Sequence, residues 1–114
     1  IMAREKPDSL AACRDTLEQA WARYFVPSPE RDSVEVLVCH GNVIRYLTGK
    51  ALGLDPLRWL RMAIGNCSIT TIRVRPDGRC QVLEVGDVGH LPPRLQTRLW
   101  FPAPRAARPA PAGR

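Results

Sequence analysis

Long apolar runs are absent from this 114-residue sequence. None approaches the ~20 apolar residues that a membrane-spanning helix requires, so we predict no membrane span within it. The first ten residues, IMAREKPDSL, also lack the apolar stretch of a secretory signal. The sequence begins with Ile1 rather than methionine, and we expect it to be a piece of a longer product.

The spacings that bind metals are absent as well. The four cysteines include no Cys-x-x-Cys, and His40 and His90 lie far apart in the sequence. Zinc sites are usually built from closely spaced ligands, so we predict neither a metal nor a cofactor. Single cysteines inside predicted elements are typical of small buried thiols. We therefore expect no disulfides and an intracellular, reducing compartment, cytoplasmic or mitochondrial.

Lysine is scarce, with only Lys6 and Lys50, so arginine carries most of the net charge of +6. Excess positive charge favours anionic partners such as phosphorylated substrates, nucleic acid or acidic membranes. We find no nucleic-acid-binding motif and no aromatic residues interleaved with the arginines of the tail, so we predict no specific nucleic-acid partner.

The length suits one small domain, which we assign to residues 1–99. Residues 100–114 consist mainly of proline, alanine and arginine, which cannot build a core, and we predict a disordered tail there.

The most informative stretch is residues 34–47, VEVLVCHGNVIRYL. Its apolar, β-branched beginning does not alternate with polar residues, which predicts a strand over residues 34–39 buried on both faces, as in a parallel sheet. The strand would end at His40-Gly41 and lead directly into a helix. Ligands bind at the carboxyl ends of such strands, and the N–H groups of a helix start attract anions. His40 is therefore a candidate phosphate ligand, and a histidine with only a structural role is the alternative.

The remaining pattern predicts helices and a hairpin around this stretch. Apolar residues at helical spacing predict a helix over residues 10–25, capped by Ser9. Helices are also predicted over residues 43–52, ended by Gly53, and over residues 56–62 after Asp55. Strands over residues 68–75 and 80–85 flank the turn sequence Pro76-Asp77-Gly78 and form a hairpin.

Four blocks together carry a resemblance: HGNVIRYL, PLRWLRM, GNCSITTIRVRPDG and GDVGHLPP. In this order and spacing they resemble the second half of the histidine phosphatase superfamily, over residues 10–98. The nearest pattern is that of the mitochondrial serine/threonine phosphatases of the phosphoglycerate mutase family. The resemblance implies an α/β fold in three layers, α/β/α, with a mostly parallel sheet, of which this chain is an incomplete C-terminal portion.

The resemblance also implies a reaction, the hydrolysis of a phosphomonoester through a phosphohistidine intermediate. The substrate would be a phosphoprotein or a small phosphate ester. In that family a histidine of an Arg-His-Gly motif is the nucleophile, a carboxylate protonates the leaving oxygen, and a second histidine contacts the phosphoryl group. His40 matches this second, catalytic histidine, and Gly41 and Asn42 match the backbone that holds the phosphate. Positioned donors of this kind stabilise the charge on the phosphoryl oxygens.

One departure from the family pattern limits this prediction. The 114 residues contain no Arg-His-Gly motif, and we find no convincing acid motif among the glutamates before His40. Because a nucleophile and an acid must both be held within reach of the substrate, we expect little or no phosphatase activity from these residues alone. The alternative is a catalytically inactive remnant that binds phosphate or a protein partner.

Three further expectations concern the surroundings of this stretch. An uncovered edge of the sheet would favour self-association, so we predict a homo-oligomer. Arg45 lies one helical turn past His40, where it either faces the pocket or is solvated or salt-bridged. We interpret His90, in the loop after the hairpin, as a structural or rim residue.

Overall fold

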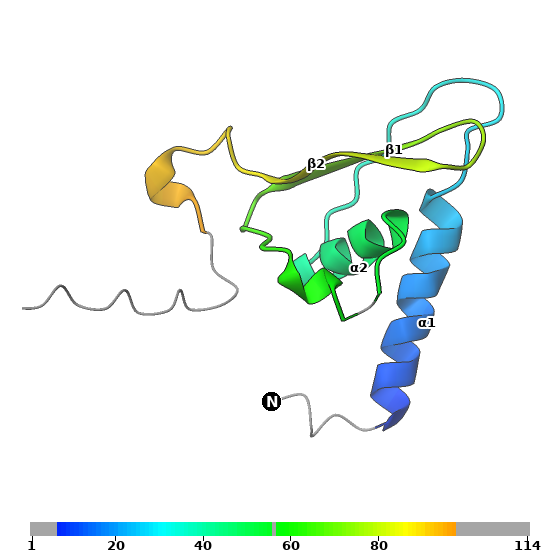
Figure 1. Ribbon diagram of the computed structural model, residues 1–114, viewed down its shortest axis with the longest axis horizontal. Coiled ribbons are helices and arrows are strands. Elements are labelled where there is room, and N and C mark those ends of the chain that lie inside the picture. Colours follow the sequence, from blue (N-terminus) through cyan, green and yellow to red (C-terminus); the bar gives the residue numbers. More distant parts are fainter. Residues whose placement is uncertain (1–6, 56, 98–114) are drawn as a thin grey trace, which may run out of the picture.

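The structure is a computed structural model, and it describes residues 7–55 and 57–97. Figure 1 shows a hairpin of two strands above α2, with α1 alongside α2. Of the described elements, α2 contacts α1, both strands and the short turn η2, so it holds the fold together. The elements in chain order are α1 (Pro7–Tyr24), α2 (Gly41–Ala51), the 3-10 turn η2 (Trp59–Arg61), β1 (Ile69–Val74), β2 (Cys80–Asp87) and the 3-10 turn η3 (Pro93–Leu95).

The predicted helices over residues 10–25 and 43–52 are confirmed as α1 and α2. The capping role of Ser9 is wrong, because α1 begins at Pro7 and Ser9 lies inside the helix. Gly53 ends α2 as expected, with a left-handed φ of 66°. The Gly53 N–H donates to the Lys50 carbonyl (3.0 Å) and the Leu54 N–H donates to the Gly49 carbonyl (2.9 Å). These two bonds form a Schellman motif, which satisfies helix-end carbonyls and lets the chain leave the helix sharply.

The predicted hairpin is confirmed as well, since β1 and β2 pair in antiparallel fashion. In the turn, the Gly78 N–H donates to the Arg75 carbonyl (2.8 Å), and Gly78 has a positive φ of 82°. Asp77 also accepts a hydrogen bond from the Arg79 N–H through its side chain (3.0 Å). Turn residues therefore fix the register of the pair, as the sequence predicts.

A register shift near the far end of the hairpin ties it to the segment before β1. The Gly86 N–H donates to the Thr70 hydroxyl (3.0 Å), and Gly86 has a positive φ of 63°. A Cβ at Gly86 would lie 3.2 Å from the Ala63 carbonyl oxygen, so only glycine allows this approach. The neighbouring Ile64 packs against the start of α2, where a Cβ at Gly41 would meet its Cβ at 3.8 Å.

The prediction of a strand over residues 34–39 is wrong for the described chain, which has no strand there. The mostly parallel, three-layer sheet is likewise not confirmed, since the sheet of the described residues has two antiparallel strands. Burial on both faces is also wrong, because Val34, Val36 and Val38 are 92%, 82% and 97% exposed. The physical reason is that a strand needs a hydrogen-bonded neighbour, and no other described segment pairs with this one.

The predicted helix over residues 56–62 is only partly correct. It shrinks to the 3-10 turn η2, and Pro56 lies outside the described residues. Asp55 is not its cap, because the N-cap of η2 is Arg58; the Asp55 carboxylate instead accepts the Leu57 N–H at 3.0 Å in a local turn before η2. The tail predicted over residues 100–114 also lies outside the described residues.

A polar cluster joins α1 to α2. The Glu18 carboxylate on α1 accepts hydrogen bonds from the Tyr46 hydroxyl and the Lys50 ammonium group, both on α2. The Lys50 Nζ also lies 5.2 Å from the centre of the Trp21 ring, within cation–π range. The bonds from Lys50 and Tyr46 lower the pKa of Glu18. Burial, followed by the bond to Glu18, raises the pKa of Tyr46 to about 12.

The raised pKa predicts how this cluster responds to alkali. Tyr46 should stabilise the fold fully below its unfolded pKa of 10.0, and this contribution should disappear as the pH rises through 12. Replacing Tyr46 by phenylalanine should lower the free energy of unfolding at neutral pH by about 0.5–1.5 kcal/mol. It should also flatten the pH dependence of that free energy over this window, measured by urea unfolding. Tyr24→Phe is the matched control, and an unchanged slope in Tyr46→Phe would contradict the prediction.

Candidate functional site

His40 is the residue directly before α2 and serves as its N-cap. Its backbone is extended, with φ −83° and ψ 158°, and its carbonyl accepts the Ile44 N–H at 3.1 Å. The imidazole makes no capping hydrogen bond, and the residue is exposed. The His40 imidazole is therefore exposed at the start of α2 and is not used as a helix cap.

Gly41 and Asn42 form the first turn of α2, where backbone N–H groups have no carbonyl partner within the helix. This turn carries no acidic residue, so nothing on it repels an anion. The partial positive charge of a helix start favours a phosphate at this place. Asn42 is exposed and Gly41 is half-buried.

Arg45 lies one turn past residues 40–42, which form the corner at the start of α2, and the sequence leaves open whether it faces the pocket or is solvated or salt-bridged. Its side chain is not solvated, since the residue is only 1% exposed. Its Nε donates to the Met62 carbonyl at 2.6 Å, and its Nη1 donates to the Asn42 Oδ1 at 2.8 Å. Burial lowers the pKa of Arg45, but a guanidinium remains charged in proteins. Asn42 and Arg45 are three residues apart on one helix, and side chains at this spacing are neighbours on the helix surface. The sequence spacing could therefore have predicted the hydrogen bond between them.

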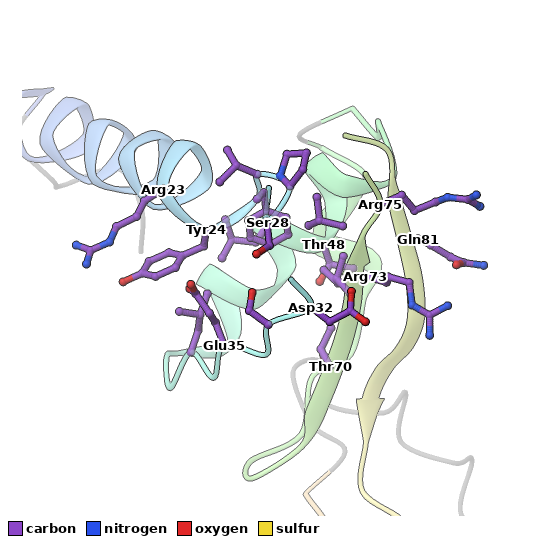
Figure 2. Close-up of a pocket in the computed structure, with 18 of the residues that line it drawn as sticks. Arg23, Tyr24, Ser28, Asp32, Glu35, Thr48, Thr70, Arg73, Arg75 and Gln81 are labelled. Atoms are coloured by element: carbon purple, nitrogen blue, oxygen red, sulfur yellow. The ribbon is translucent and has the colours of Figure 1, made fainter. Parts of the chain in front are cut away.

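A cavity of about 980 Å³ lies beside this corner. Figure 2 shows its walls, which come from the end of α1, the connection to α2, α2 itself and the hairpin. Thr48 of α2 lines the cavity and is 1% exposed, and its hydroxyl has no hydrogen-bond partner among the described residues. The wall residues labelled in the figure are Arg23, Tyr24, Ser28, Asp32, Glu35, Thr48, Thr70, Arg73, Arg75 and Gln81.

One wall of the cavity is the segment that leads to His40. Glu35, Leu37 and Cys39 line the cavity, while the valines between them are exposed on the other side. This alternation is the geometry of an extended strand, although no strand partner is present among the described residues. Burial raises the pKa of the Cys39 thiol, which fits its place in this wall.

The opposite wall is β1. Within the described chain, β1 pairs only with β2, so one of its edges has no partner strand. Consecutive residues of β1, such as Ile72 and Arg73, both line the cavity, as expected where an unpaired edge faces it. The cavity thus lies between two stretches of extended backbone.

Other parts of the described chain add no ligands to this corner. His90 is exposed in the turn after β2, and no contact places it beside His40. Among the described residues, no group of three His, Cys, Asp or Glu side chains is arranged to hold a metal ion. Nor is any helix of residues 7–55 and 57–97 long and apolar enough to cross a bilayer.

Known proteins similar to this chain are serine/threonine phosphatases. It is 50% identical over 80 residues to "Serine/threonine-protein phosphatase Pgam5, mitochondrial" of Caenorhabditis elegans, covering 68% of this chain and 28% of that protein. The human protein of the same name is 43% identical over 88 residues (77% and 29%). That of Xenopus tropicalis is 40% identical over 97 residues (82% and 35%). The chain thus spans about a third of the length of these relatives.

A family model provides the broader classification. The model of the histidine phosphatase superfamily (branch 1) matches residues 3–88. The matched region includes the corner at His40, all of α2 and the hairpin. The chain therefore belongs to the histidine phosphatase superfamily.

Proposed function

We propose that this chain is the phosphate-binding portion of a phosphomonoester hydrolase that acts on serine/threonine phosphoproteins. The observation that carries the proposal is His40, which lies exposed at the start of α2 within the region matched by the superfamily model. The names of the relatives support a phosphoprotein substrate and a mitochondrial location.

In the proposed reaction, a nucleophilic histidine outside these 114 residues attacks the phosphorus atom. The bond to the ester oxygen breaks, and this oxygen leaves with a proton from a carboxylic acid. Water then attacks the phosphohistidine and releases inorganic phosphate. A ring N–H of His40 and the backbone N–H groups of Gly41 and Asn42 donate to the phosphoryl oxygens, where charge is concentrated in the transition state.

We further propose that the strand bearing the nucleophile inserts into the cavity. The nucleophile must reach His40, so the carboxyl end of its strand lies beside the carboxyl end of residues 34–39, and the two strands run parallel. Leu37 on one wall and Ile72 on the other offer apolar side chains to such a strand. It would also pair with the backbones of residues 34–39 and β1.

The second candidate function is a catalytically inactive protein that binds phosphate or a protein partner at the same corner. The observation in its favour is that the 114 residues contain no Arg-His-Gly motif. The two candidates differ in whether a supplied nucleophile half restores turnover.

The first test is a chimera in which the nucleophile half of a superfamily phosphatase precedes this chain. We expect it to hydrolyse p-nitrophenyl phosphate and a phosphothreonine peptide, and we expect the 114 residues alone to release almost no phosphate. His40→Ala should lower kcat/KM of the chimera by about 100- to 1,000-fold, the cost typical of a lost transition-state donor.

His90→Ala is the control for this test, because it removes the other histidine of the sequence from an exposed turn. It should leave kcat/KM unchanged. Robust turnover by the 114-residue chain, or a chimera indifferent to His40→Ala, would contradict the proposal. A folded chimera that binds phosphate without turnover would favour the inactive binding protein.

The exposed valines predict self-association. Val34, Val36 and Val38 alternate along one side of an unpaired segment and are 82–97% exposed. Unpaired extended backbone with apolar side chains tends to pair with another copy. We expect dimers or larger species in size-exclusion chromatography with light scattering, and Val36→Lys should shift them toward monomer. Val26→Lys is the control at a less exposed valine, and a compact monomer that resists concentration would contradict the prediction.

A further inference from the structure

Arg45 connects the corner at His40 to a distant segment of the chain. Its guanidinium donates to Asn42, on the first turn of the same helix, and to the Met62 carbonyl, 17 residues further along. Arg45 itself is 1% exposed, and both of its bonds are partly buried. Bonds from a charged donor are among the stronger hydrogen bonds, and losing one partner in a buried place is costly.

The bond to Asn42 decides which way that carboxamide points. A guanidinium only donates hydrogen bonds, so the atom of Asn42 that faces it must be the acceptor, Oδ1. The NH2 group of Asn42 is then turned away from Arg45. Asn42 is exposed on the first turn of α2, so this NH2 group can donate to an anion bound there.

The bond to Met62 holds the segment that packs against the start of α2. Two residues after Met62, Ile64 lies against Gly41, with its Cβ 3.8 Å from where a Cβ of Gly41 would be. Arg45 thus restrains the start of α2 from two directions, through Asn42 and through the segment that packs against Gly41.

We propose that Arg45 is a positioning residue of the phosphate site, which holds Asn42 by its oxygen so that the Asn42 NH2 group donates to the bound phosphate. This inference rests on the proposed function, because it takes the start of α2 as the phosphate site. It adds the Asn42 side chain as a donor and a buried arginine that orients it.

The test is a titration of the 114-residue chain with inorganic phosphate, followed by NMR. In the unaltered chain, the backbone amide signal of Gly41 and the side-chain NH2 signals of Asn42 should shift together. Arg45→Lys keeps the positive charge but cannot bridge two acceptors in the same fixed geometry. We expect it to weaken phosphate binding by about tenfold, the loss given by about one charge-assisted hydrogen bond.

A double-mutant cycle separates positioning from mere structural support. If Arg45 acts through Asn42, Asn42→Ala weakens binding to a similar degree, and Arg45→Lys with Asn42→Ala binds no worse than either single variant. Arg61→Lys is the matched control, the same substitution at an exposed arginine of η2, and it should leave phosphate affinity unchanged. The amide signals of the hairpin report whether each variant is folded.

The outcomes separate this inference from the proposed function. A Gly41 shift with unmoved Asn42 NH2 signals, or additive losses in the cycle, would overturn the role of Arg45 and leave the phosphate site standing. Absence of any shift at His40 and Gly41 would overturn both. If Arg45→Lys does not fold, Arg45→Gln takes its place in the cycle, and Asn42→Ala, at an exposed residue, still tests whether the Asn42 side chain donates to phosphate.

Discussion

The packing of α2 is the constraint on which the rest of this structure depends. An isolated helix of 11 residues would be marginal in water, so its stability must come from its neighbours. Gly49 allows the closest of these contacts, since a Cβ there would lie 2.9 Å from the Trp59 Cβ. The buried residues of α2 are Arg45, Leu47, Thr48 and Gly49, and only Leu47 among them has a large apolar side chain. The helix that forms the core is therefore also the helix that has His40 as its N-cap.

The surface around the cavity is suited to completion by further chain. Three exposed valines on residues 34–39 would each contribute about 1.5–3 kcal/mol if they were covered. The Thr48 hydroxyl is buried without a partner in the described residues, an arrangement that costs free energy until a partner arrives. Both features favour docking of a strand into the cavity and of a covering layer onto the valines.

Sequence patterns predicted those elements whose signals are local. Gly53 and the Pro76-Asp77-Gly78 turn mark a helix end and a hairpin through backbone preferences that need no distant partner. The segment at residues 34–39 has the composition of a buried strand, but a strand forms only with a neighbour that the described residues do not supply. His40 was placed correctly before a helix because its neighbours Gly41 and Asn42 mark the change from extended chain to helix. The burial of Arg45 does not follow from the sequence, because it depends on Met62, whose position no local pattern encodes.

Amide hydrogen exchange over residues 34–39 tests most directly whether the nucleophile strand inserts into the cavity. The comparison is between the 114-residue chain and the chimera with a nucleophile half. We expect rapid exchange in the chain alone, where these amides have no strand partner, and strong protection in the chimera, where they would pair with the inserted strand. If the chimera hydrolyses phosphate esters and these amides still exchange rapidly in it, as in the chain alone, the nucleophile strand does not insert beside residues 34–39.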